Sequence, residues 1–95
     1  MRIVNWGKAK QFVTRFPRAE APLNHWKRAV KDGRWKNFVE ITQSFNSADQ
    51  VGEYTVFDIG GNNFRLIAII IFRCETVYIR HVLTHAEYEK GKWRK

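Results

Sequence analysis

The stretch from Tyr54 to Leu83, YTVFDIGGNNFRLIAIIIFRCETVYIRHVL, decides the fold. Three segments within it, residues 54–59, 64–72 and 76–83, are rich in β-branched and aromatic side chains, a composition that favours strands. The two connections between them, GGNN and RCE, are of hairpin length. We therefore predict that these segments form a three-stranded antiparallel meander.

The residues before this stretch have helical periodicity. From Trp6 to Phe16 the apolar residues fall on one face, and Pro17 ends this helix because proline lacks an amide donor and clashes with the preceding turn. A second helix is predicted from Pro22, which suits a first turn, to a C-cap at Gly33. The aromatic spacing predicts a shorter helix over residues 35–45.

Two short segments complete the predicted architecture, an opening strand over residues 2–5 and a turn over residues 46–50. A chain of 95 residues, 44% of them hydrophobic, can bury one core but not two. We predict one α+β domain over residues 1–95, with N-terminal helices packed on one face of a twisted antiparallel sheet.

The net charge of +8 indicates a polyanionic partner, because fixed cations displace the counterions condensed on phosphates. The excess lies in residues 1–45, which hold ten basic and three acidic side chains. The alternative is that many small bacterial domains are simply basic. The outer face of the second predicted helix is a candidate for binding an RNA backbone, or else a solvated face. Its cations are Lys27, Arg28, Lys31 and, just beyond, Arg34.

The composition also predicts the compartment. Cys74 is the only cysteine, so no disulfide forms within the chain. No apolar stretch of secretory-signal length occurs in residues 1–16, and the longest apolar run, Leu66–Phe72, cannot span a bilayer at seven residues. We expect a cytoplasmic protein that makes no membrane contact.

Two arginines lie within apolar strands, where a guanidinium loses hydration unless it meets an anion. Arg65 is at the hairpin end of its strand, and Arg80 is toward the far end of the last one. Each is a candidate for binding an RNA phosphate, and the alternative is an ion pair with a carboxylate such as Asp58 or Glu53. Alternation along the last strand places Val82 on the same face as Arg80.

The segment Thr84–Tyr88, THAEY, follows the last predicted strand at once. Thr84 and Glu87 have the spacing of a capping box. On one helical turn His85 and Tyr88 project together. An imidazole and a phenol beside guanidiniums suit metal-free RNA cleavage, which needs a base, cations and an acid. The alternative is that both side chains serve packing or capping.

Other chemistries have little support in the sequence. The three histidines and one cysteine show no zinc spacing, so we expect no metal site and no cofactor. The GGNN segment is too short for a phosphate-binding loop and does not open a helix, which predicts an ordinary turn. The histidines are His25, His81 and His85.

Two motifs resemble the HigB family of toxins. They are F-x-I-G-G-N-x-x-R-L within Val56–Leu66 and T-H-x-E-Y at the end of Val77–Tyr88. Trp35–Phe38 and Ser47–Asp49 are also similar to that family, so the resemblance covers essentially the whole chain. It implies a RelE-like fold with an open concave face opposite the helices. It also implies messenger RNA interferase activity, usually on the translating ribosome, and a helix-turn-helix antitoxin of the HigA type encoded alongside.

The resemblance also implies roles for individual residues. Relatives with this fold place an arginine at the position of Arg65 and further catalytic side chains where His85 and Tyr88 lie. We assign Arg65 and Arg80 to phosphate binding and transition-state charge, His85 to proton transfer, and Tyr88 to orienting a base or the phosphate. RelE toxins carry lysines on the strand that matches residues 54–59, and this chain has none there, so Asp58 is a second choice as base. Two further candidates for RNA contact are Lys36 and Asn62.

Two other functions fit the same predicted fold. A ParE-like toxin inhibits gyrase by binding it, and a nucleic-acid-binding domain acts without catalysis. Fold cannot separate these possibilities, because function resides in the site. The pair His85 and Tyr88 favours the nuclease, which would leave a cyclic 2′,3′-phosphate.

Overall fold

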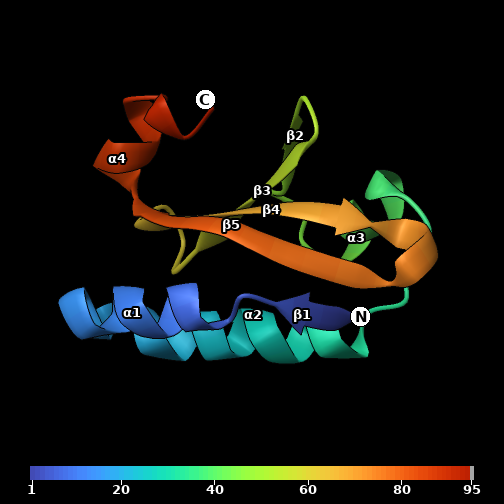
Figure 1. Ribbon diagram of the computed structural model, residues 1–95, viewed down its shortest axis with the longest axis horizontal. Helices are drawn as coiled ribbons and strands as arrows, with labels where there is room; N and C mark the ends of the chain where they lie inside the picture. Colours follow the sequence, from blue (N-terminus) through green and yellow to red (C-terminus); the bar gives the residue numbers. More distant parts are fainter. Residues whose placement is uncertain (95) are drawn as a thin grey trace.

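A computed structural model describes residues 1–94 and shows two helices lying along one face of a five-stranded sheet (Figure 1). The strands are β1 (Arg2–Val4), β2 (Asp49–Val51), β3 (Tyr54–Ile59), β4 (Phe64–Ile71) and β5 (Thr76–Thr84). The helices are α1 (Gly7–Arg15), α2 (Glu20–Asp32), α3 (Phe38–Ser44) and α4 (His85–Glu89), with 3-10 turns at Pro17–Ala19, Phe72–Cys74 and Lys92–Arg94. The predicted α+β class is confirmed.

The strand order in the sheet is β1-β5-β4-β3-β2. The predicted meander is confirmed, since β3, β4 and β5 pair as antiparallel neighbours. The sheet is nevertheless mixed, because β1 pairs in parallel with β5, with Arg2 opposite Thr76. No local pattern could show this pairing, because it joins residues far apart in the chain.

The predicted turn over residues 46–50 is wrong in its last part. Asp49 and Gln50 belong to β2, which pairs antiparallel with β3. Gly52, at a φ of +60°, makes the tight connection between these two strands. The polar composition predicted a turn, but pairing with β3 holds these residues in a strand.

The helix ends differ from the prediction at two places. Pro17 ends α1 as predicted, but the chain turns at once through a 3-10 turn, so α2 begins at Glu20 rather than Pro22. The third helix begins at Phe38 rather than residue 35, because the Asn37 side chain accepts a hydrogen bond from the amide of Glu40 and caps it. None of the helices among residues 1–94 has the length and apolarity that crossing a membrane requires.

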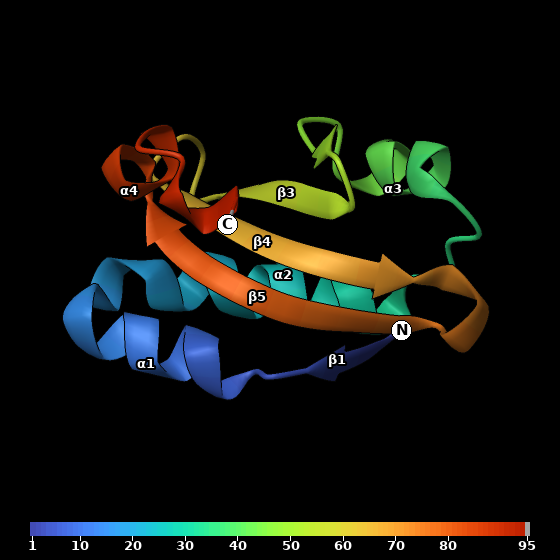
Figure 2. The ribbon, with the colours of Figure 1, turned by 45° about the horizontal axis from the view of Figure 1, so that its top comes forward.

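The main core lies between the sheet and helices α1 and α2 (Figure 2). Leu66 and Ala68 of β4 face this core, where Trp26 of α2 meets Phe57 edge to face at 5.5 Å. Ile67 faces the other side, where it packs in a small cluster that includes Trp93. Side chains therefore alternate between the two faces of the sheet along β4.

Alternation fails along β5, because the strand contains a β-bulge. Ile67 pairs with His81 and Ala68 pairs with Ile79, which leaves Arg80 without a partner on β4. The extra residue returns Val82 to the helix side, where it packs against the same core as Ile79. The prediction that placed Val82 on the face opposite to Ile79 is wrong for this reason.

Candidate functional site

A buried arginine occupies the start of β4. Arg65 is only 7% exposed and lies directly opposite Asp58 on β3. Its Nε is 3.1 Å from Oδ1 of Asp58. The expected alternative of a carboxylate partner is thus confirmed for Arg65, with Asp58 and not Glu53. This partly buried ion pair holds the guanidinium in one place.

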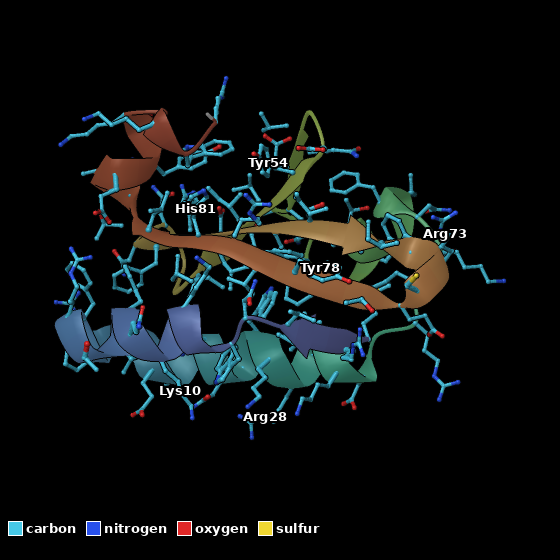
Figure 3. The ribbon with its side chains drawn as sticks, in the orientation of Figure 1. Lys10, Arg28, Tyr54, Arg73, Tyr78 and His81 are labelled. Atoms are coloured by element: carbon cyan, nitrogen blue, oxygen red, sulfur yellow. The ribbon has the colours of Figure 1, made fainter. Side chains whose placement is uncertain are left out.

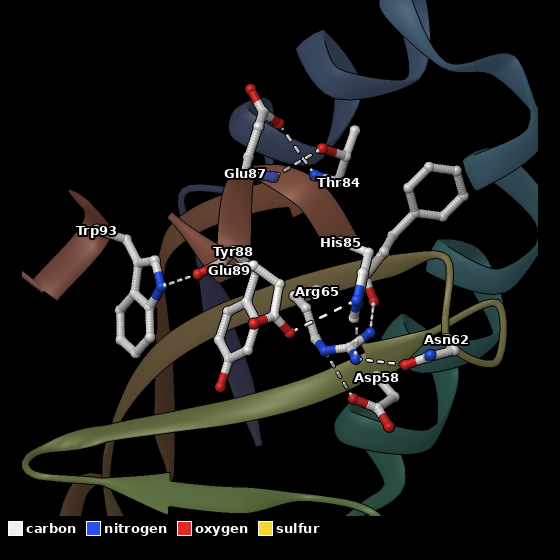
Figure 4. A network of polar contacts seen from close by, with 10 residues as sticks. Asp58, Asn62, Arg65, Thr84, His85, Glu87, Tyr88, Glu89 and Trp93 are labelled. Atoms are coloured by element: carbon white, nitrogen blue, oxygen red, sulfur yellow. Dashed lines mark hydrogen bonds and ion pairs between the residues drawn. The ribbon is translucent and has the colours of Figure 1, made fainter. Parts of the chain in front are cut away.

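The remaining donors of Arg65 are almost all used (Figure 4). Nη1 donates to the carbonyl oxygen of Phe64 at 3.1 Å, and Nη2 donates to the side-chain oxygen of Asn62. Nη2 also lies 3.3 Å from Nδ1 of His85. A guanidinium has five N–H groups in a fixed plane. The contacts with Asp58 and these three residues leave one hydrogen, on Nη1.

His85 opens α4, immediately after the last residue of β5. The Thr84 side chain accepts from the amide of Glu87, and Glu87 accepts from the amide of Thr84, so the predicted capping box is confirmed. The amide of His85 donates to the carbonyl oxygen of Asn63 at 3.0 Å, which ties α4 to the β3–β4 turn. The imidazole is thereby held beside Arg65 while 44% of its surface stays exposed.

The contact with Arg65 also sets the tautomer of His85. An arginine N–H can only donate, so Nδ1 accepts, and a neutral ring then carries its proton on Nε2. Nε2 lies 3.5 Å from Oε1 of Glu89, one turn later on α4. The imidazole therefore bridges a cation and a carboxylate, and each of its nitrogens has a defined neighbour.

Tyr88 covers the other side of the guanidinium. The centre of its ring is 5.3 Å from Cζ of Arg65, a cation–π distance. Trp93 stacks on Tyr88 at 5.3 Å and donates from Nε1 to its carbonyl oxygen. Three of the four predicted catalytic residues, Arg65, His85 and Tyr88, are thus brought together at one end of the sheet.

Arg80 is not part of this group. The bulge leaves its side chain exposed at the outer side of β5, in a groove shared with Lys8, Arg15 and His81. The pKa of His81 is lowered from its usual value, first by burial and then by the nearby charges of Lys8 and Arg80. The groove therefore has a positive potential of its own, separate from the pair of Arg65 and Asp58.

The predicted RNA-binding residues are dispersed. Asn62 belongs to the Arg65 network, whereas Lys36 and Arg34 line a surface cavity with Phe72 at the opposite end of β4. Three of them, Lys27, Arg28 and Lys31, belong to α2 on the far side of the sheet from His85. Figure 3 shows Arg28 pointing away from the sheet.

Sequence reasoning missed three residues near the site. Glu89 is the neighbour of His85, and its signal was the spacing of four along one helix. Arg15 and Arg18 line a cavity with His85 between the end of α1 and the start of α4. No sequence spacing could reveal these two, because only the tertiary packing of α1 brings them to α4.

The group of side chains offers phosphate-binding and proton-transfer chemistry. The guanidinium of Arg65 supplies positive charge, the imidazole of His85 can exchange protons, and the carboxylates of Asp58 and Glu89 flank them. Across residues 1–94, His, Cys, Asp and Glu side chains do not gather in threes that could hold a metal ion.

Comparison with known proteins identifies a family of toxins. The family model HigB_toxin, described as the RelE-like toxic component of a toxin–antitoxin system, matches residues 19–91. The chain is 28% identical to a protein of Escherichia coli O6:H1 named mRNA interferase HigB, over 95% of this chain and 90% of that protein. It is 27% identical to the mRNA interferase toxin HigB of Escherichia coli K12, over 94% of this chain and 88% of that protein.

Proposed function

This chain belongs to the HigB toxin family, the RelE-like toxic component of a toxin–antitoxin system, and on that premise we propose that it is an endoribonuclease that cuts messenger RNA. The observation that carries the proposal is the contact between Nη2 of Arg65 and Nδ1 of His85, 3.3 Å apart at the exit of the sheet. The names of the relatives favour an RNA interferase over the gyrase-binding alternative.

The proposed reaction is an attack by the RNA's own 2′-hydroxyl on the adjacent phosphate. A base removes the proton of the ribose 2′-hydroxyl, and the 2′-oxygen attacks the adjacent phosphorus. The bond from phosphorus to the 5′-oxygen then breaks, and an acid protonates that oxygen. The products are a 2′,3′-cyclic phosphate and a 5′-hydroxyl. Arg65 stabilises the charge that builds on the phosphate oxygens.

The contact between Arg65 and His85 suggests how binding and proton transfer are coupled. In the free protein the lone pair on Nδ1 of His85 is occupied by an Arg65 hydrogen. A phosphate that takes this hydrogen releases Nδ1, which can then accept the 2′-hydroxyl proton. Glu89, 3.5 Å from Nε2, stabilises the imidazolium that results. Asp58 is a less suitable base because it already holds Nε of Arg65.

Tyr88 acts by position in this scheme. Its ring lies over the guanidinium at 5.3 Å and is itself stacked on Trp93, so it helps to hold Arg65 in position for a phosphate. We further propose that cleavage takes place on the translating ribosome in the cytoplasm, where it inhibits translation. A helix-turn-helix antitoxin neutralises the protein.

The test is the chemistry of the RNA ends. Ribosomes programmed with a defined messenger are incubated with the protein, and the new ends are mapped and typed. We expect breaks inside the coding region with 2′,3′-cyclic phosphate on one side and 5′-hydroxyl on the other. His85→Gln is the matched control, because it removes the imidazole at a half-exposed position. Intact messenger would overturn the proposal, and DNA double-strand breaks in cells producing the protein would favour the gyrase-binding function.

A further inference from the structure

Helix α1 and strand β5 enclose a basic groove on the outer side of the sheet. Strand β1 pairs with β5 only as far as Tyr78, so from Ile79 onward β5 has no strand on that side and α1 lies beside it. The groove has a volume of about 260 Å³ and no carboxylate among its lining residues. Its lining consists of Lys8, Gln11, Phe12, Arg15, Arg80, His81, Val82 and Leu83.

The cations of this α1–β5 groove are weakly compensated. Among residues 1–94, neither Lys8 nor Arg80 forms an ion pair. Arg15 reaches Glu87 only at 3.8 Å, with both side chains substantially exposed, and such a pair contributes little. The lowered pKa of His81, due first to burial and then to Lys8 and Arg80, is consistent with uncompensated positive charge here.

The groove leads toward the site of the proposed reaction. Arg15 also lines a second cavity, of about 570 Å³, whose other lining residues include Arg18 and His85. Cations thus continue from Lys8 and Arg80, past Arg15 and Arg18, to the imidazole of His85.

We propose that the α1–β5 groove binds the phosphodiester backbone of the substrate RNA next to the bond that is cut. The inference rests on the proposed function for the identity of the substrate. It gives Arg80 a flanking phosphate, in place of the reacting one assigned to it from the sequence. Contacts of this kind position a strand without selecting its bases, so they fit an enzyme that must accept many messengers.

The test measures RNA binding apart from cleavage. A single-stranded RNA oligonucleotide with 2′-O-methyl groups lacks the attacking hydroxyl and stays intact, so its Kd can be measured by fluorescence anisotropy at several salt concentrations. The variant Lys8→Gln/Arg80→Gln removes two groove cations. We expect the Kd to rise. We also expect the slope of log affinity against log salt concentration to flatten by about 0.7 for each phosphate that the protein no longer binds, or about 1.4 in all.

The matched control is Lys10→Gln/Arg73→Gln. It also removes one lysine and one arginine, but both are exposed and lie away from the groove, Lys10 on the outer side of α1 and Arg73 at the distant β4–β5 connection (Figure 3). We expect its salt slope to stay close to that of the unaltered protein. An unchanged slope in Lys8→Gln/Arg80→Gln, or an equal weakening of binding in the two variants, would overturn the proposal.

Two further outcomes separate this inference from its rivals. If the unaltered protein binds the oligonucleotide through the groove but cuts no messenger, the proposed function fails and the groove stands. If RNA binding is unchanged in Lys8→Gln/Arg80→Gln while binding of the partner antitoxin weakens, the groove accepts an acidic protein segment, and the RNA proposal is wrong.

Discussion

Nδ1 of His85 lies 3.3 Å from Nη2 of Arg65, so the nitrogen that could accept a proton faces a group that only donates. The same guanidinium is also held by Asp58, whose Oδ1 lies 3.1 Å from its Nε. Arg65 therefore contributes both to the stability of the sheet, through Asp58, and to the proposed reaction, through His85. A change at Asp58 acts first on the fold, whereas a change at the half-exposed His85 acts first on the reaction.

Replacing His85 by glutamine is expected to remove cleavage and leave the fold intact. General acid–base groups contribute at least about 100-fold to a rate, and the amide of glutamine does not titrate. The side chain is 44% exposed, so its removal opens no cavity. Single-turnover cleavage and the unfolding midpoint, measured on the same preparation, check this. A variant that cuts normally would exclude His85 from proton transfer.

Replacing Asp58 by asparagine is expected to lower the free energy of unfolding by about 1–3 kcal/mol, because a buried cation then loses its charged acceptor. Asp49→Asn, at an exposed position on β2, is the control and should change little. Urea titration of both variants gives the comparison. Equal stability of the two would mean that solvent screens the ion pair of Arg65 and Asp58 although Arg65 is buried.

Stability is expected to fall as the pH drops below about 6.5, the usual pKa of histidine, and His81 is part of the cause. Its pKa is lowered in the folded protein by burial, Lys8 and Arg80, so the unfolded chain binds the proton first. At pH values between the usual pKa and the lowered one, protonation of His81 therefore favours unfolding. Above this pH range His81 is neutral in both the folded and the unfolded chain. His81→Gln should flatten this part of the curve of unfolding free energy against pH.

The gene beside this one is expected to encode a protein that binds the toxin and neutralises it. Membership of a toxin–antitoxin family is the reason for this expectation. Co-expression followed by size-exclusion chromatography would show a complex, and growth would recover. Two proteins that elute separately, with growth still arrested, would contradict the assignment of that gene as the antitoxin.

The outer face of α2 is expected to contribute to ribosome binding through charge alone. Arg28→Gln/Lys31→Gln is the suitable variant, because Lys27 lies 4.7 Å over the ring of Trp6 and its replacement would also alter packing. The salt dependence of ribosome affinity should flatten by about one unit for each phosphate that α2 no longer binds. An unchanged slope would leave this face of α2 merely solvated.

The sequence by itself determined the elements and their local devices. Composition and connection length predicted the meander of β3, β4 and β5, and proline placed the end of α1. The spacing of Thr84 and Glu87 predicted the capping box, and the adjacent His85 and Tyr88 followed from the same turn. All of these depend on neighbours within a few residues, where propensity and hydrogen bonding act directly.

Only the tertiary structure decided which distant groups meet. The parallel pairing of β1 with β5 and the bulge at Arg80 arise from registers set over the whole sheet. The bulge leaves Arg80 without a partner on β4, and the packing of α1 along β5 brings Arg15 to the cavity that His85 lines. Such contacts join residues far apart in the chain, and they form because helix and sheet must bury their apolar faces against each other.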